Sequence, residues 1–234
     1  MSISENLATV RDRISKAARR AGRLPEEIAL IAVSKTQPPE RIREAYSAGQ
    51  RLFGESRVQE FAGKFEALRD LKDAEWHMIG HLQTNKATRT VELFRAVDSV
   101  DSLKLAEKLD SAARALGRKM EALIEINLGG EAAKSGVAAD SPALEELLTA
   151  APRLEALVFR GLMTVPPFTD DPQNARPFFR RLRELHDAIA ARTLPSVTMD
   201  RLSMGMSHDF EVAIEEGSTC VRVGTAIFGQ RQKP

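Results

Sequence analysis

Short apolar runs and longer amphipathic segments alternate along this chain of 234 residues. The apolar runs are rich in β-branched residues and several end in glycine, which is typical of buried parallel strands. The segments between them repeat their apolar positions at helical spacing. The strand-like runs lie at residues 28–35, 51–54, 76–80, 94–100, 121–128, 154–164, 198–204 and 219–224.

Strands that alternate with helices predict a parallel sheet and an α/β fold. Eight such units without a low-complexity linker predict a single (β/α)8 TIM barrel domain over residues 1–234. A doubly wound open sheet is the alternative. After the first strand, helices are expected at 39–49, 55–71, 103–116, 141–151, 174–191 and 207–216, with one more that reaches Leu93. A polar loop is expected at 129–136 and a short tail at 225–231.

An extra N-terminal helix is predicted over residues 2–22, before the first strand. Ser4 is its expected N-cap, and Gly22 ends it. The arginines on this helix fit a basic targeting helix. Acidic residues such as Glu5 and Asp12 lie among them, which favours a lid that packs against the bottom of the barrel.

Composition excludes several classes of protein. A formal net charge of +1 and a pI of about 7.9 give no electrostatic case for binding nucleic acid or an anionic membrane. No apolar run approaches the roughly 20 residues of a membrane span. The N-terminus also lacks the apolar core of a secretory signal. The single cysteine, Cys220, fits a reducing compartment, so we expect a cytoplasmic protein.

Lys35 is the first candidate for chemistry. It follows the apolar run that ends at Val33, and two prolines, Pro38 and Pro39, then stop the strand and open a helix. The carboxyl end of a buried strand is where α/β folds keep their functional groups. A partly desolvated lysine has a lowered pKa and can form a Schiff base, although Lys35 could also simply extend to solvent.

Two stretches near the C-terminus predict a phosphate site. Met204, Gly205, Met206 and Ser207 precede a short helix, whose free amides and the Ser207 hydroxyl can bind an anion. Gly224 and Thr225 follow the eighth strand. Barrels commonly bind phosphate at the loops after strands seven and eight. Arg222 precedes Gly224 by two residues, so both point to the same face, toward a ligand or an ion-pair partner.

The remaining titratable residues carry weaker signals. The four histidines show no metal-ligand spacing, so no metal site is expected. Only His81, at the end of the third strand, is a site candidate, and His77 is expected to be packed. Glu55 and Asp98 could act as acids or as ion-pair partners. Cys220 is expected to be a packed strand residue rather than a nucleophile.

A Schiff-base lysine combined with a phosphate site implies pyridoxal 5′-phosphate (PLP). The cofactor's aldehyde bonds a lysine, and its phosphate anchors the other end. An aldolase that acts on a sugar phosphate is the competing interpretation of the same residues.

Six motifs follow one another along the chain: residues 32–36 (AVSKT), 53–60 (FGESRVQE), 76–86 (WHMIGHLQTNK), 161–164 (GLMT), 202–207 (LSMGMS) and 221–229 (VRVGTAIFG). They resemble the pyridoxal phosphate homeostasis protein family (YggS/PROSC), whose fold is similar to the N-terminal barrel of alanine racemase. The resemblance covers nearly the whole chain. Where the family pattern after Phe-Gly-Glu is Asn-Tyr, this chain has Ser56-Arg57.

The resemblance implies that Lys35 holds PLP as a covalent aldimine, and that Ser207, Gly224 and Thr225 hold its phosphate. It also implies that Arg222 approaches the pyridine nitrogen, which leaves that nitrogen unprotonated and the ring a poor electron sink. No catalytic residue is predicted. The full set of predicted cofactor contacts is Lys35, Ser207, Arg222, Gly224, Thr225, His81, Met204 and Ser56.

By the same resemblance, the protein carries and buffers PLP in intracellular PLP homeostasis, without established catalytic turnover. PLP-dependent apo-enzymes are the expected recipients, and a monomer is expected. The alternative is a PLP-dependent amino-acid racemase. A two-base racemase needs a second acid/base group opposite the lysine. The only tyrosine, Tyr46, lies on the helix after the first strand, so the carrier is favoured.

Overall fold

The computed structural model describes residues 2–129 and 135–230. Most of the polar loop expected at 129–136, and Arg231 at the end of the expected tail, therefore lie outside the described residues.

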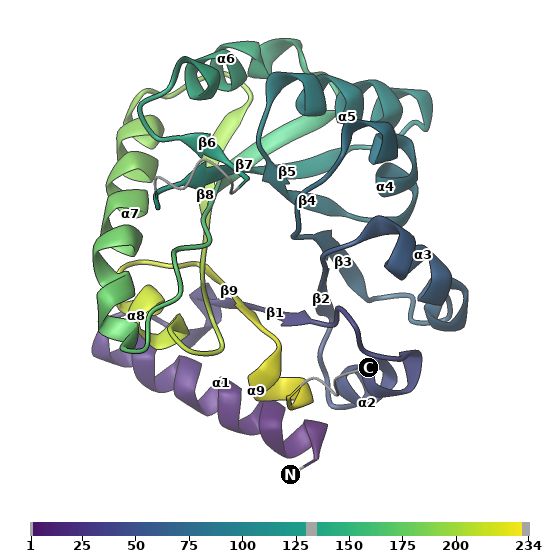
Figure 1. Cartoon of the computed structure of the whole chain (residues 1–234), viewed down its shortest axis with the longest axis vertical. Helices are drawn as coiled ribbons and strands as arrows, with labels where there is room; N and C mark the ends of the chain where they lie inside the picture. The colour runs from purple at the N-terminus through teal and green to yellow at the C-terminus, as the bar shows by residue number, and fades with distance from the viewer. Residues whose placement is uncertain (1, 130–134, 231–234) are drawn as a thin grey trace.

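Eight parallel strands form a closed barrel, which confirms the predicted fold (Figure 1). Strand β4 pairs with β5, with Ala96 opposite Glu121, and this pairing joins the two ends of the sheet. The open doubly wound sheet is therefore excluded. The barrel strands are β1 (Ala29–Val33), β2 (Leu52–Glu55), β3 (Glu75–Met78), β4 (Ala96–Val100), β5 (Met120–Asn127), β7 (Leu157–Met163), β8 (Val197–Met206) and β9 (Cys220–Val223).

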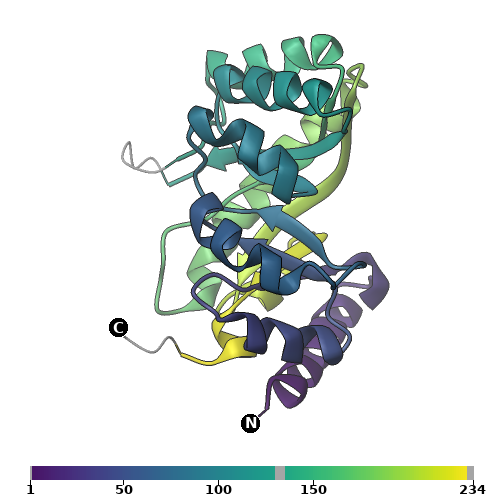
Figure 2. The ribbon, with the colours of Figure 1, turned by 90° about the vertical axis from the view of Figure 1, so that its right-hand side faces the viewer.

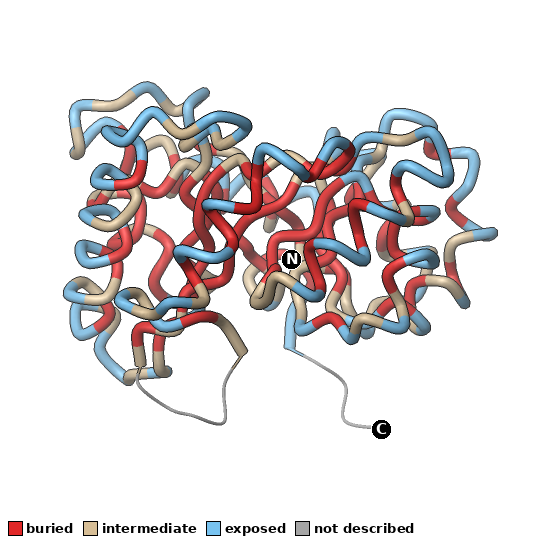
Figure 3. The backbone as a smooth tube through the Cα atoms, turned by 90° about the horizontal axis from the view of Figure 1, so that it is seen from above, coloured by how far each residue is buried: buried red, intermediate tan, exposed pale blue. Residues whose placement is uncertain are grey.

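Helices surround the barrel, and Figure 3 shows buried segments inside a mostly exposed outer surface. Their buried positions recur at helical spacing, because each helix covers the strands with one apolar face. The α-helices of the described residues are α1 (Ile3–Arg20), α2 (Pro39–Ser47), α3 (Val58–Phe65), α4 (Ala87–Leu93), α5 (Leu103–Ala115), α6 (Pro142–Ala150), α7 (Arg176–Ala191), α8 (Phe210–Glu215) and α9 (Thr225–Phe228). Short 3₁₀ helices lie at Pro25–Glu27, Glu66–Leu68, Thr84–Lys86, Ala151–Arg153 and Pro172–Ala175.

Two short elements were not expected. Strand β6 (Val137–Ala138) pairs with the end of β5 and lies directly after the predicted polar loop. Helix α9 (Thr225–Phe228) lies inside the predicted tail. Neither element is long enough to show a periodic pattern of apolar residues, so the sequence pattern could not reveal them.

The N-cap of the first helix lies two residues before the expected one. Ser2, not Ser4, is the N-cap of α1: its hydroxyl accepts a hydrogen bond from the Glu5 amide at 3.2 Å. The Glu5 carboxylate accepts from the Ser2 amide in return, at 2.7 Å. This reciprocal pair is a capping box, in which two amides at the helix start are satisfied together.

Helix α1 belongs to the outer ring of helices and is not a lid over the bottom of the barrel. It packs against α8 and α9 on one side and α2 on the other (Figures 1 and 2). Arg13 pairs with Glu211 at 3.0 Å and Arg20 with Glu215 at 2.9 Å, both on α8. Because α9 has only four residues, α1, which packs against it, completes the ring of helices between α8 and α2.

Candidate functional site

A cavity of about 920 Å³ lies at the carboxyl ends of the barrel strands. This is the end at which barrels of this class keep their functional groups. Three of the predicted contact residues, Lys35, Ser56 and His81, border it. The other described residues that line it are Arg57, Ile79, Gly80, Asp101, Glu125, Ile126, Asn127, Ser135, Gly136 and Val165.

Lys35 lies in the turn that follows β1, as predicted, and is half-buried. The next residue, Thr36, has a φ of 64°, in the left-handed region that β-branched residues rarely occupy. Backbone of this kind persists only where the surrounding structure holds it, and it occurs often at functional sites.

Ser207, Gly224 and Thr225 lie together after β8 and β9. The Ser207 hydroxyl oxygen accepts hydrogen bonds from the amides of Gly224 at 3.2 Å and Ala226 at 3.4 Å. The Thr225 hydroxyl lies 3.4 Å from the same oxygen. Gly224 packs against Val33: a Cβ atom placed on Gly224 would lie 3.4 Å from the Val33 carbonyl oxygen. This group of hydroxyls and amides is therefore beside the strand that leads to Lys35.

The loop after β8 differs from the expectation in one respect. Helix α8 begins at Phe210, and the Asp209 carboxylate accepts a hydrogen bond from the Met206 amide at 2.6 Å. Ser207 therefore does not cap α8 and contacts the start of α9 instead. Burial raises the pKa of Asp209, against the opposing effect of that hydrogen bond.

Arg222 is buried in the barrel rather than exposed at its mouth. Its guanidinium group donates to the Ser203 hydroxyl at 2.6 Å and to the Thr164 carbonyl at 2.7 Å. Burial lowers the pKa of Arg222, although nearby acidic groups oppose this. Met204 is also buried, with 0% of its surface exposed, and in this arrangement its side chain offers no surface to a ligand.

The other candidate acids contact buried basic side chains. Glu55 is buried and lies 2.9 Å from the Lys64 ammonium group. Asp98 lies 3.1 Å from the ring of His77, and both are buried. Cys220 is packed as expected, and its burial raises the pKa of the thiol to about 12. The thiol is therefore a poor nucleophile. Among the described residues, no group of three or more His, Cys, Asp or Glu side chains could hold a metal ion.

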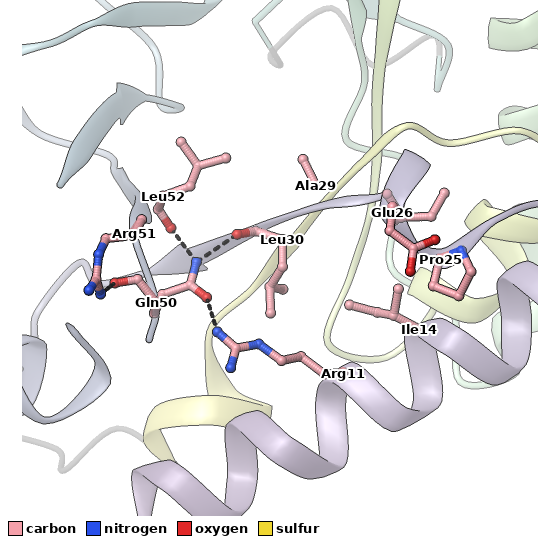
Figure 4. Close-up of a pocket in the computed structure, with 10 residues that line it drawn as sticks. Arg11, Ile14, Pro25, Glu26, Ala29, Leu30, Gln50, Arg51 and Leu52 are labelled. Carbon is pink, nitrogen blue, oxygen red and sulfur yellow. Dashed lines mark hydrogen bonds between the residues drawn. The ribbon is translucent and has the colours of Figure 1, made fainter. Parts of the chain in front are cut away.

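A second cavity, of about 430 Å³, lies at the opposite end of the barrel, beside the amino ends of β1 and β2 (Figure 4). Its buried amide, Gln50, donates to the carbonyl oxygens of Leu30 and Leu52, each at 2.7 Å. The Gln50 oxygen accepts from Arg11 at 3.3 Å. These polar groups satisfy one another, and none of the predicted contact residues borders this cavity.

Comparison with known proteins assigns the family. The alanine racemase N-terminal domain model matches residues 6–232. The pyridoxal phosphate homeostasis protein of Aquifex aeolicus is 47% identical over 232 residues, covering 99% of this chain and 100% of the relative. The pyridoxal phosphate homeostasis protein of Escherichia coli K12 is 44% identical, covering 98% of this chain and 97% of the relative. This chain belongs to the pyridoxal phosphate homeostasis protein family.

Solved structures agree with this assignment to the homeostasis protein family. PipY of Synechococcus elongatus PCC7942, determined with PLP bound, superposes with a TM-score of 0.85 at 39% identity, over 97% of this chain and all of PipY. Alanine racemase of Streptomyces coelicolor superposes with a TM-score of 0.72 at 21% identity, over 97% of this chain but 58% of the racemase. The racemase shares the fold of this family.

Glu125 and Asp101 border the cavity of this family member, yet the sequence pattern did not single them out. Glu125 is 6% exposed on β5, and one of its carboxylate oxygens accepts from Ser135 at 2.8 Å. The other oxygen is buried, and no donor among residues 2–129 and 135–230 bonds it. The Asp101 carboxylate contacts the exposed His81 ring at 3.1 Å. A charged residue within an apolar strand was the available signal for Glu125.

Proposed function

We propose that this protein binds PLP and carries and buffers it in intracellular PLP homeostasis, with Lys35 as the covalent anchor through an aldimine. The observation that supports this most directly is the position of Lys35 at the cavity, in a chain 39% identical to a protein whose structure contains PLP. When bound, PLP supplies a reactive aldehyde and an electron-withdrawing ring.

The residues present fit this cofactor. Lys35 supplies a half-buried primary amine, and Ser207, Gly224 and Thr225 supply hydroxyl and amide groups for a phosphate. Arg222 is a buried cation in the same half of the barrel, bonded to Ser203. We propose that Ser56 and His81, at the cavity wall, are further contacts. We leave the buried Met204 out of the proposed contact set.

We propose that the protein acts without catalytic turnover. A two-base racemase needs a second proton donor opposite its lysine. The only tyrosine of the chain, Tyr46, lies on α2, where its hydroxyl contacts Asp73 and its ring lies under the Arg51 guanidinium group. These contacts belong to the amino end of the barrel, away from Lys35.

The first test is a visible absorption spectrum of the purified protein, followed by borohydride reduction and peptide mapping. We expect a visible band that is lost on reduction, with the added mass on Lys35. Lys35→Ala should abolish both, whereas the exposed control Lys104→Ala should change neither. A wild-type protein that remains unmodified in excess PLP would contradict the proposal. Racemisation of alanine or serine well above the rate with free PLP would instead support the racemase.

We further propose that PLP-dependent apo-enzymes are the recipients and that the carrier is a cytoplasmic monomer. Loaded protein should reactivate an apo-enzyme in the presence of a phosphatase that destroys free PLP, if transfer needs direct contact. Reactivation only without the phosphatase would indicate transfer through free PLP. Sedimentation velocity measures the oligomeric state. Across residues 2–129 and 135–230, no helix is both long and apolar enough to cross a membrane.

A further inference from the structure

One buried ammonium group binds both ends of the turn that contains Lys35. Lys64 lies on α3 and is 8% exposed. Its Nζ atom lies 3.1 Å from the carbonyl oxygen of Ser34 and 3.3 Å from that of Gln37. These two carbonyl groups flank Lys35 and Thr36 in the chain. A single side chain, which comes from α3, therefore binds the turn at both of its ends.

Two glutamates hold the ammonium group in place and bind the same turn. Lys64 lies 2.9 Å from Glu55 and 3.1 Å from Glu60. Glu55 accepts a hydrogen bond from the Ser34 hydroxyl at 2.6 Å, and Glu60 accepts one from the Thr36 amide at 2.6 Å. The network therefore contacts the residue before Lys35 and the residue after it.

Burial and the contacts with Lys64 act in opposite directions on the two carboxyl groups of this network. Burial raises the pKa of Glu55, and the Lys64 charge opposes that rise. Partial burial also raises the pKa of Glu60. Hydrogen bonds from the Thr36 amide and from Lys64 outweigh this effect, so the pKa of Glu60 is lowered overall. A buried charge that loses its partner is strongly destabilising, so the three side chains depend on one another.

The turn needs such support because of its backbone. Thr36 has a φ of 64°, a backbone conformation that is strained for a non-glycine residue. The Glu60 bond to the Thr36 amide and the Lys64 bond to the Gln37 carbonyl act directly on this segment. Without them, less strained conformations that point Lys35 elsewhere become accessible.

We propose that Lys64 is a positioning residue for Lys35: held by Glu55 and Glu60, its ammonium group binds the Ser34 and Gln37 carbonyls and orients the Lys35 amine toward the cavity. The proposal rests on the proposed function, because it assigns Lys35 as the PLP anchor. It also gives a role to the stretch from Gly54 to Glu60, which contains both glutamates but only one predicted cofactor contact, Ser56.

The test compares Lys64→Met and Glu60→Gln with Asp110→Asn. Asp110 is a buried acid on α5 that accepts from the Ala156 amide at 2.6 Å, far along the chain from the Lys35 turn. Its replacement controls for loss of stability. Four quantities are measured: the dissociation constant for PLP, visible circular dichroism at saturating PLP, the melting temperature, and amide hydrogen exchange of residues 34–37 in the apo-protein.

We expect Lys64→Met to weaken PLP binding about tenfold or more and to change the visible circular dichroism, because small misplacements of a reacting group are costly. Glu60→Gln should also weaken PLP binding, by about threefold. This variant leaves the Lys64–Glu55 pair intact, so it can be measured even if Lys64→Met does not fold. Asp110→Asn should lower the melting temperature yet leave the dissociation constant and the dichroism unchanged. Lys64 and Glu60 variants that match Asp110→Asn in both quantities would overturn the proposal.

Failure of the proposed function has a different signature. In that case, wild-type protein shows no visible band and no reduced adduct on Lys35. Amide exchange of residues 34–37 then still decides the role of Lys64. Faster exchange there in Lys64→Met or Glu60→Gln than in Asp110→Asn supports the positioning role, and equal exchange overturns it.

Discussion

The hydroxyl oxygen of Ser207 lies 3.2 Å from the backbone nitrogen of Gly224, so the loops after β8 and β9 meet at one side chain. The two residues are 17 positions apart in the chain. Parallel strands β8 and β9 are neighbours, with Met206 opposite Arg222, and this register brings the two loops together. A hydroxyl and several amides gathered in this way suit a phosphate group.

We expect Ser207→Ala to weaken PLP binding by roughly 10- to 150-fold, because a hydrogen bond to a charged group is worth about 1.5–3 kcal/mol. Binding of pyridoxal, which lacks the phosphate, should change less than about twofold. Spectral titration of the apo-protein with each compound measures both. Ser141→Ala, which removes an exposed hydroxyl bonded to the Ala138 carbonyl, is the matched control. Equal losses for the two compounds would argue against a phosphate contact.

Arg222→Lys should destabilise the protein by about 2 kcal/mol, which lowers the melting temperature by roughly 4–8 °C in a domain of this size. A lysine cannot donate to the Ser203 hydroxyl and the Thr164 carbonyl with the same forked geometry. Ser203→Ala should cost less, since it removes one neutral acceptor. Thermal unfolding of the apo-proteins gives the comparison. An Arg222→Lys variant as stable as wild type would show that the fork is dispensable.

Glu125→Gln should stabilise the apo-protein at pH 8 but not at pH 4. Burial, with a further contribution from Asp101, raises the pKa of Glu125, against the Ser135 hydrogen bond. The folded state thus holds this proton more tightly than the unfolded state. The favourable contribution is complete below the unfolded pKa, near 4.3, and is lost as the pH rises through the folded pKa.

Glutamine is neutral at every pH, so the variant avoids that loss. We expect a gain of about 1 kcal/mol, or roughly 2–4 °C in melting temperature, at pH 8. Glu145→Gln is the control, because the Arg192 hydrogen bond lowers the pKa of Glu145 and its replacement should give no gain. A gain for Glu125→Gln that is the same at pH 4 and pH 8 would refute the electrostatic explanation.

Gly80→Ala should disturb the cavity wall, whereas Gly63→Ala should not. A Cβ on Gly80 would lie 2.5 Å from the Ser56 carbonyl oxygen, which is backbone and cannot swing aside. We expect a loss of about 1–3 kcal/mol and weaker PLP binding. A Cβ on Gly63, within α3, meets no atom within 4 Å, so alanine should stabilise that helix by about 0.5–1 kcal/mol. Chemical denaturation measures both, and a neutral Gly80→Ala would contradict the close approach.

The barrel could be predicted because each strand carries its own local signal. Runs such as the one before Lys35 are apolar on both faces, as strands between a barrel interior and a layer of helices must be. Elements without such a signal were missed: β6 has two residues and α9 has four. The cap of α1 was misplaced by two residues because Ser2 and Ser4 are both suitable caps.

The candidate site was predictable only in part. Lys35, Ser56 and His81 follow β1, β2 and β3, and parallel strands that close into a barrel bring their carboxyl ends to one rim. The burial of Met204 and of the Glu125 carboxylate depends on which neighbours fill the barrel, and a one-dimensional pattern does not contain that information.

The sequence by itself determined the fold class, the order of the strands and the place of Lys35 at a strand end, because periodicity and turn residues act over a few neighbouring positions. Only the tertiary structure decided which distant groups meet. Lys64 reaches the Ser34 carbonyl across 30 positions, and Arg222 reaches the Thr164 carbonyl across 58. Hydrogen bonds and ion pairs depend on distances in space of about 3 Å, which only the folded chain sets.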